Sequence, residues 1–478
     1  MPPIQTMETE FVPKDTREFL GKLLVKDCSR SLYFDRYARP GAVREDRQAF
    51  FIEGFKTHTD LVRLRSWAVA SGAIAKCGVR FYAQLQSRLM VNMSGGVMEN
   101  AGLCLDRYGL PYTPGSAVKG CARRAALAAL NEWCETGEKP SGADNLFSRA
   151  CEPFDDPDSM LAAIARVFGW CEQDWGDKSD FAWATGKPPE ALSKAAVALA
   201  GSIGRTIAPE HAGTPWKSLP NSAGGVAFLS AHPVELPKGT DIQGMKTPAV
   251  GELELDVVTC HHPDYYQGER TVATDDEDPN PVVFPAVAAG HVFGFALRRL
   301  RCVEADLRHA EAWLRCGLGT FGLGAKTAAG YGWFDCSEAV GNAVSESIQR
   351  RVEREKRAAE EAAAKAKAEA EAKAKEEEKE KLRAALEGLT GEDLANKQVE
   401  LMTKEQFWSK VQAFHKESKK GGPLDEHRKA LVRALRGARL DVWKQFKEKA
   451  KSGDLAKAAD AIRSLSKQMY TGNEGRMP

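Results

Sequence analysis

The chain has 478 residues, which is enough for two or three domains. Its 67 Lys/Arg and 66 Asp/Glu residues nearly cancel, so the overall charge selects neither nucleic acid nor a membrane surface as a partner. No run approaches the roughly 18 apolar residues of a membrane span, and the 11 cysteines form no CxxC pair of the zinc-knuckle or thioredoxin type. We therefore expect a cytoplasmic protein with no membrane partner.

The N-terminal region contains one local feature, the aromatic and charged segment SLYFDRYARPG at Ser31–Gly41. Its spacing alone predicts an irregular segment at the surface. A run rich in β-forming residues with partial alternation follows at Gly78–Val91 and predicts a strand.

A helical pattern then covers Leu110–Trp133. Pro111 and Pro114 keep the backbone extended before the helix, and Ser116 is the predicted N-cap. Apolar residues repeat at helical spacing and predict one buried stripe, formed by Val118, Ala122, Ala125, Ala129 and Trp133.

Three cations, Lys119, Arg123 and Arg124, fall in the first turns of this predicted helix. Positive charge there opposes the helix dipole at a small cost. An anion bound at the helix N-terminus would offset that cost, because free N–H groups and the dipole both favour negative charge there. An ordinary amphipathic helix with a solvated basic face explains the same pattern, so both interpretations stay open.

The middle of the chain alternates turn-rich stretches with short periodic segments. Residues 135–220 include helical patterns at Ser159–Phe168 and Pro189–Ala200 and are interpreted as an insertion. Strands are predicted after it, at Gly225–Leu236, Glu252–Cys260 and His291–Leu300.

Residues 261–284 are rich in turn residues and include the acidic run Asp275–Asp278, which predicts a second insertion in the form of a long loop. Cys260, His261 and His262 stand at its start. Successive side chains of an extended strand point to opposite faces, so we expect no metal site there.

A glycine-rich stretch, Gly317–Phe334, follows a helical pattern at Glu304–Cys316. Such glycine density predicts a loop with positive φ or close backbone approach, and successive N–H groups of such a loop converge on an anion. Lys326 and Thr327 would add a charge and a hydroxyl. The order helix, loop, strand matches neither a Walker A loop nor a dinucleotide fingerprint. A turn that only permits tight packing accounts for the glycines equally well.

Composition changes abruptly after residue 342. Residues 343–389 are mostly Ala, Glu, Lys and Arg, with Glu before Lys at i,i+4 spacing, as in Glu361–Lys365 and Glu369–Lys373. Apolar heptads are missing, so we predict a solvated helical spacer of roughly 60 Å that does not pack along the preceding domain. Deleting residues 343–478 should then leave a folded protein.

Residues 390–478 predict a small unit of three helices. Thr403 and Gln406 form a capping box before the first, Pro423 opens the second, and the third carries Leu455 and Ile462. This stretch holds 19 Lys/Arg against 12 Asp/Glu, a net charge of +7, which favours nucleic acid or an acidic partner.

Residues 1–342 have the predicted order strand, helix, insertion, strands, helix, glycine loop, strand. This order fits an α+β class fold, a ferredoxin-like (RRM-like) βαββαβ core with large insertions. LPYTPGSAVKGCARRAAL resembles the PGSSLKG helix start of the RAMP superfamily of CRISPR-associated proteins, and GLGAKTAAGYGWF resembles that superfamily's glycine-rich loop. SLYFDRYA, LELDVVTCHHPDYYQGE and DDEDPNPVVF are similar to segments of the sixth subunits of Cmr (type III-B) effector complexes. The resemblance covers about residues 30–338.

The resemblance implies an RNA-binding subunit that is not an enzyme and holds neither cofactor nor metal. It implies a place at the head of the complex, near the 3′ part of the CRISPR RNA. The implied partners are the CRISPR RNA, target RNA indirectly, and other Cmr subunits, especially the backbone RAMP and the other head RAMP. Valine at Gly324 or Gly330 should weaken assembly on RNA in a folded protein. The predicted RNA contacts are Gly115, Ser116, Lys119, Gly120, Arg123, Arg124, Gly322, Gly324, Lys326, Thr327, Gly330 and Gly332.

Three departures from the superfamily pattern bear on these contacts. Ala117 stands where a second serine is frequent, and Ala328 and Ala329 replace residues that are often polar or basic. Lys326 is therefore expected to be the main cation of the loop.

Two other functions remain as alternatives. An endoribonuclease without metal would need a general acid and base, for which His291 and His309 are the available histidines. A metal-dependent one would need an exposed loop aspartate, for which Asp275, Asp276 and Asp278 are available. An adaptor that works through its helical tail is the third possibility.

Overall fold

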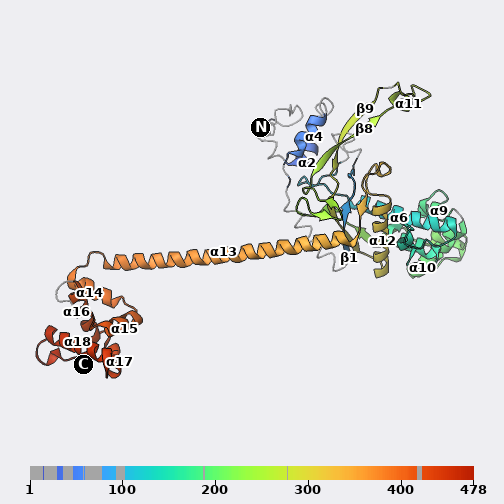
Figure 1. Ribbon diagram of the computed structural model, residues 1–478. Helices are drawn as coiled ribbons and strands as arrows, with labels where there is room; N and C mark the ends of the chain where they lie inside the picture. The colour runs from blue at the N-terminus through green and yellow to red at the C-terminus, as the bar shows by residue number, and fades with distance from the viewer. Residues whose placement is uncertain are drawn as a thin grey trace. The chain divides into compact units, whose positions relative to one another are not determined.

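The computed structural model describes residues 14, 29–35, 47–57, 59, 78–92, 103–186, 189–276, 278–416 and 423–478 (Figure 1). The chain forms two compact units, Met1–Val352 and Glu353–Pro478. Of the predicted acidic run, Glu277 lies outside the described residues, as do residues 36–41 of the aromatic N-terminal segment. Every helix within the described ranges is too short or too polar to cross a lipid bilayer.

The first unit is built on an antiparallel sheet whose strands lie in the order β11–β1–β10–β4, with β5 also paired to β10. The central pair, β1 and β10, places Phe81 opposite Phe295, and their rings stack at 5.3 Å between centroids. All the predicted strands exist, although the one at Gly78–Val91 ends at Leu85 and the one at Gly225–Leu236 is broken into two short strands. The strands are β1 (Gly78–Leu85), β4 (Val226–Phe228), β5 (His232–Pro233), β10 (Val292–Arg299) and β11 (Phe334–Asp335).

Two helices, α6 (Gly115–Thr136) and α12 (Glu304–Thr320), pack against each other and against this sheet. The predicted apolar stripe of α6 is confirmed, because its residues from Val118 to Trp133 are buried. Helix α12 runs one turn further than predicted and includes Gly317. A Cβ atom there would lie 2.7 Å from the carbonyl oxygen of Cys121, so this glycine lets the two helices approach closely.

The predicted insertion at 135–220 folds as a helical layer beside α6. Asp156 caps α8 by accepting a hydrogen bond from the Ser159 N–H at 2.8 Å. Arg166 of α8 reaches the buried carboxylate of Asp306 on α12 at 2.9 Å, which ties this layer to the sheet unit. Its elements are α7 (Ser148–Cys151), α8 (Pro157–Phe168), β2 (Gly169–Trp170), η2 (Glu172–Trp175), α9 (Asp180–Ala184), α10 (Pro189–Ser202), η3 (Pro209–His211), η4 (Pro215–Ser218) and β3 (Ser222–Ala223).

A long hairpin of β8 (Leu253–Cys260) and β9 (Asn280–Val287) extends from the sheet unit (Figure 1). The predicted loop at 261–284 is therefore shorter than expected, because β9 begins at Asn280 and α11 (Pro263–Gln267) occupies part of the turn. The predicted irregular segment at Ser31–Gly41 is instead helical over α2 (Arg30–Asp35). Two smaller pieces complete the unit, α4 (Arg47–Phe55), which contacts β8 and β9, and the β6 (Asp241–Ile242) and β7 (Met245–Lys246) pair.

Helix α13 (Glu338–Leu386) contains the charged stretch, and its first turns belong to the sheet unit. Val340 and Val344 are fully buried in a small cluster with Leu236, Ile242 and Val292. The expectation that residues from 343 onward do not pack on the preceding domain is therefore wrong for the first turns. Two ion pairs further along, Lys365–Glu369 at 3.9 Å and Lys367–Glu371 at 4.0 Å, place lysine before glutamate, opposite to the predicted order. In a third, Glu376 precedes Lys379 at a spacing of three residues.

The second unit has five α-helices among its described residues after α13, where the sequence predicts three. The capping box of Thr403 and Gln406 is confirmed at the start of α15. The predicted second helix is divided by Gly437, and α14 is an additional helix. Trp443, Phe446 and Ile462 lie in a hydrophobic core of its own. The elements are α14 (Gly391–Glu400), α15 (Lys404–Ala413), α16 (Pro423–Arg436), α17 (Leu440–Lys449), α18 (Gly453–Met469) and η6 (Gly472–Gly475).

Candidate nucleic-acid interface

The start of α6 is shaped by close backbone contact. A Cβ atom on Gly115 would overlap the carbonyl oxygen of Phe228 on β4, so only glycine fits there. The N-cap is Pro114, which has no capping side chain, and the predicted cap Ser116 lies exposed within the first turn. The Ser116 hydroxyl is thus not used to cap the helix. Gly120 faces open space, where a Cβ atom would meet nothing within 4 Å.

The three cations of this helix have different surroundings. Burial, and to a lesser degree the charge of Arg123, lower the pKa of Lys119. Arg123 is already held by two carboxylates, pairing with Asp180 of α9 and lying 3.8 Å from Asp174. Arg124 is exposed, and its guanidinium lies 4.4 Å from the centre of the Phe321 ring. Lys119 and Arg124 are therefore better placed than Arg123 to meet an anion.

Three glycines of the loop permit packing. A Cβ atom on Gly324 would overlap the carbonyl oxygen of Met90, and one on Gly332 would overlap that of Leu323. A Cβ on Gly322 would lie 2.9 Å from the Tyr331 oxygen. All three also have positive φ. The tight-packing interpretation therefore explains these three glycines.

Most loop N–H groups are also used inside the protein. Those of Leu323, Ala325 and Gly332 donate to Gly332, Met90 and Arg88 at 2.7 to 2.8 Å, and those of residues 329–331 donate within the loop. The expectation that many N–H groups converge on an anion is wrong for these residues. Anion binding at the loop tip therefore rests on the side chains of Lys326 and Thr327 and on the N–H groups of residues 326–328.

The loop tip remains open. Gly330 has a φ of 89°, and a Cβ atom there would meet nothing within 4 Å. Lys326 also adopts the left-handed conformation, with a φ of 55°, which is uncommon for a residue other than glycine. Its ammonium lies 5.4 Å from the centre of the Phe284 ring on β9. The loop thus begins beside α6, and its tip at Lys326 lies against the β8–β9 hairpin.

A polar cluster beside the loop was not found from the sequence. Arg88 pairs with Glu254 at 2.8 Å and with Asp256 at 3.0 Å, and Tyr331 donates its hydroxyl proton to Asp256. Burial and this hydrogen bond raise the pKa of Tyr331 to about 12. Glu254 and Asp256 are two residues apart and therefore share one face of β8. This spacing is the sequence signal that could have predicted the cluster.

The histidines considered for catalysis have structural partners. His291 is buried, accepts a hydrogen bond from the Gly251 N–H at 3.0 Å and contacts the Ala288 oxygen at 2.7 Å. Burial lowers the pKa of His291. His309 packs against Phe154, with 4.5 Å between ring centroids. Within the described ranges, no group of three His, Cys, Asp or Glu residues is arranged to hold a metal ion.

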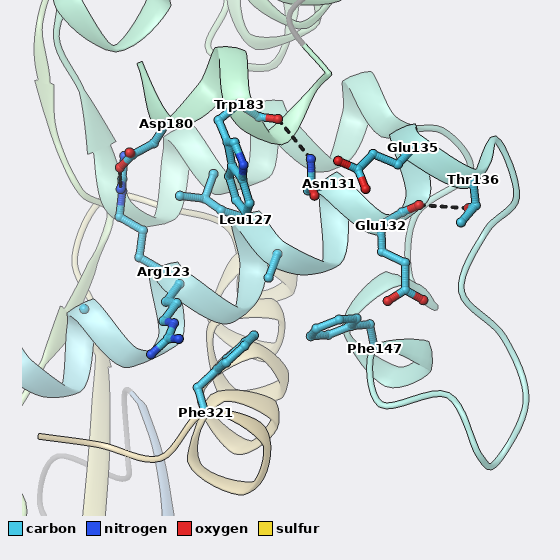
Figure 2. A pocket seen from close by; sticks show the side chains of 13 residues that line it. Arg123, Leu127, Asn131, Glu132, Glu135, Thr136, Phe147, Asp180, Trp183 and Phe321 are labelled. Carbon is cyan, nitrogen blue, oxygen red and sulfur yellow. Dashed lines mark hydrogen bonds and ion pairs between the residues drawn. The ribbon is translucent and has the colours of Figure 1, made fainter. Parts of the chain in front are cut away.

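A groove of about 700 Å³ runs along the outer face of α6 (Figure 2). The exposed Arg124 is one of its lining residues. Three predicted RNA contacts, Gly120, Arg123 and Arg124, line one part of it. The sequence did not predict the other lining residues, because only folding brings together α6, α9 and the segments around Phe147 and Phe321.

Residues 66–335, more than half of the chain, match the family described as RAMP superfamily. The chain belongs to the RAMP superfamily. The family match covers the sheet of this RAMP, both of its packed helices and the glycine loop as far as β11.

The relatives of this RAMP include the CRISPR system Cmr subunit Cmr6 of Pyrococcus furiosus, which is 28% identical over 265 residues. That match covers 52% of this chain and 64% of the relative. Among solved structures, a chain of the Type III-B Cmr-beta complex bound to cognate target RNA is 17% identical at a TM-score of 0.34, covering 64% of this chain and 79% of that one. The crystal structure of Cmr6 from Pyrococcus furiosus is 22% identical at a TM-score of 0.26, covering 54% and 97%.

Proposed function

We propose that this RAMP is a non-catalytic RNA-binding subunit of a type III-B CRISPR–Cas (Cmr) effector complex that acts in antiviral defence. The sequence match to Cmr6 supports the complex. The observation that carries RNA binding is the contact between Arg124 and Phe321, which brings the cationic first turns of α6 to the start of the glycine loop. Phosphate groups meet Arg124 at this contact, and Lys119 lies nearer the start of the same helix.

The body of the subunit is, in this proposal, a ferredoxin-like core. The order β11–β1–β10–β4, with α6 after β1 and α12 after β10, follows the βαββαβ arrangement. Sheets of this kind serve as platforms for single-stranded RNA in other proteins.

The subunit's place is proposed to be the head of the complex, near the 3′ part of the CRISPR RNA. Its neighbours are the backbone RAMP and the other head RAMP, and it meets target RNA indirectly. The subunit itself performs no cleavage in this proposal. The surroundings of His291 and His309 support this. His291 contacts the backbone of Gly251 and Ala288. His309 packs on Phe154 and lies 3.9 Å from Asp306, a carboxylate already paired with Arg166.

Assembly on RNA tests this function. The full chain and the other Cmr subunits are mixed with CRISPR RNA, and the affinity is measured at several salt concentrations. We expect binding that weakens with salt, since phosphate contacts release counterions. Incubation of the chain alone with labelled RNA, with and without Mg²⁺, should give no cleavage. A chain that neither binds RNA nor enters the complex would overturn the proposal, and metal-dependent cleavage would favour the endoribonuclease.

The second unit favours an additional role as an adaptor. It has a hydrophobic core of its own around Phe407, Trp443 and Phe446, so it does not need the RAMP body to bury its apolar residues. With its net charge of +7 over residues 390–478, this unit is suited to RNA or an acidic protein. Assembly with a chain that ends before residue 390 separates this role from that of the RAMP body.

A further inference from the structure

The groove on α6 has two aromatic walls and a floor of small side chains. In Figure 2, Trp183 of α9 stands on one side of the helix, and Phe147 and Phe321 lie on the other. The two phenylalanine rings stack at 6.0 Å between centroids. Trp183 is 48% exposed although it is a large apolar residue. Phe147 is buried and Phe321 is half-buried, so Trp183 supplies the exposed ring face of the groove, beside a floor of Gly120 and Ala128. An exposed ring face of this kind is suited to a flat ligand.

Charge changes sign along this groove. Arg124 lies at the end nearest the glycine loop, and Glu132 and Glu135 lie at the other end. Eight residues of helix separate Arg124 from Glu132, a rise of about 12 Å. Figure 2 shows the Glu135 carboxylate on the Trp183 side and the Glu132 carboxylate on the Phe147 side. The groove therefore suits a ligand with an anionic end, a flat middle and an edge of hydrogen-bond donors.

The polar residues of the acidic end are held in place. Asn145 donates to the Glu132 carboxylate at 2.8 Å, and Asn131 donates to the Trp183 carbonyl oxygen at 3.0 Å. Glu132 keeps a second carboxylate oxygen for a ligand, and Glu135 is exposed beside it. Arg123 is already paired with Asp180, which leaves Arg124 as the cation at the opposite end.

We propose that this groove binds one unpaired nucleotide of an RNA strand and prefers guanine. The nucleotide's phosphate meets Arg124, its base stacks on Trp183, and its Watson–Crick edge donates to the glutamates. Guanine offers two adjacent donors, N1–H and the N2 amino group, to a carboxylate, whereas adenine, cytosine and uracil each offer one donor group on that edge. Unpaired RNA bases are read in this way, by stacking on aromatic rings and hydrogen bonds to their edges. A volume of about 700 Å³ suits a small ligand.

This inference rests on the proposed RNA-binding function, because the phosphate contacts of α6 would deliver the strand to the groove. The negative charges that line the groove favour a single nucleotide over a long stretch of RNA backbone, because Asp180, Glu132 and Glu135 would repel further phosphates. A peptide with a basic side chain is the competing occupant, and the experiment below separates the two.

The test uses the full chain and labelled single-stranded RNAs of eight nucleotides that differ at one position. That position carries guanine, inosine, adenine, cytosine or uracil in an otherwise uracil sequence. Inosine lacks only the N2 amino group, so it removes one donor and keeps the stacking surface. Fluorescence anisotropy should give about tenfold tighter binding for guanine than for inosine.

Variants locate the effect. Glu135→Gln and Glu132→Gln should reduce the preference for guanine over inosine, and Trp183→Ala should weaken guanine RNA about tenfold. Glu190→Gln, at an exposed position of α10, is the matched control and should leave every affinity unchanged. Thermal unfolding of each variant confirms that it is folded.

The results separate this inference from the proposed function. Equal affinity for all five RNAs, unchanged in Trp183→Ala, would overturn the groove while leaving RNA binding intact. Loss of a Cmr subunit from the assembled complex in Trp183→Ala, with RNA affinity unchanged, would make the groove a protein-docking site and overturn the nucleotide proposal. If none of the RNAs binds, nor the CRISPR RNA, the proposed function fails and this inference fails with it.

Discussion

The guanidinium of Arg124 lies 4.4 Å from the centre of the Phe321 ring. Arg124 belongs to the helix-start motif and Phe321 directly precedes the glycine loop, so two motifs far apart in the sequence meet at this point. Arg124 is exposed and Arg123 is held by Asp180. We therefore expect Arg124 to serve RNA binding and Arg123 to serve the structure.

The two arginines should respond differently to removal. Arg124→Ala should weaken binding to all RNA sequences alike, because a phosphate contact carries no sequence information, and should leave thermal stability nearly unchanged. Arg123→Ala should lower stability by up to about 1 kcal/mol, because Asp174 and the largely exposed Asp180 lose their cation. Filter binding and thermal unfolding of both variants measure this. A stable Arg123→Ala protein with the larger loss of affinity would reverse the assignment.

The loop glycines give a second prediction. Gly324→Val should destabilise the protein by about 3 kcal/mol or more, because the new side chain would overlap the Met90 carbonyl group at a positive φ. Gly330→Ala should cost only about 1 kcal/mol, since its surroundings are open and only φ is strained. The expectation that Gly324→Val stays folded is therefore withdrawn. Denaturant unfolding of the two variants should differ clearly, and similar midpoints would contradict the close contact with Met90.

Lys326 is the direct test of the loop tip. Lys326→Ala should lower RNA affinity and make the slope of log K against log salt shallower by about 0.7, the value for one phosphate of a single strand. Lys217→Ala, an exposed lysine of η4, is the matched control. An unchanged slope in Lys326→Ala would remove this lysine from the RNA interface.

Stability should fall as the solution becomes mildly acidic. Burial lowers the pKa of His232, His291 and His309 below the usual 6.5, so the unfolded chain binds more protons in that range. Their contribution is fully present above pH 6.5 and is lost as the pH falls through their folded pKa values. Melting temperatures between pH 7.5 and 5.5 measure this. His291→Gln should be less stable at pH 7.5 yet vary less with pH, and an equally steep dependence would argue against a role for His291.

Truncation of the tail should depend on the exact end point. A chain ending at residue 342 loses the buried Val344 and the Arg351–Glu235 ion pair of 3.1 Å. It should be less stable than a chain ending at residue 356, which keeps both. Residues 388–478 should unfold cooperatively on their own, because their core is self-contained. Calorimetry of the three fragments tests this, and equal stability of the chains ending at residues 342 and 356 would show that the first turns of α13 add nothing.

Local patterns in the sequence determined much of the architecture. The apolar stripe of α6, the β-forming run of β1 and the capping box at Thr403 depend on residues close in the chain, and the structure contains all three. The helix start and glycine loop were also recognisable as motifs, and the family match now covers both. Helix boundaries were less secure. Helix α12 continues through Gly317 because that glycine packs on Cys121, a contact between distant segments.

Only the tertiary structure decided how each site residue is used. The N–H groups of Leu323 and Gly332 donate to backbone carbonyl groups, and Arg123 pairs with a carboxylate of the insertion. Val344 is buried in a small hydrophobic cluster at the start of α13. Trp183, Phe147 and Glu135 come from separate elements and form one groove only after folding. A sequence pattern reports which residue types are near one another along the chain, whereas burial, pairing and free space depend on which distant segments pack together.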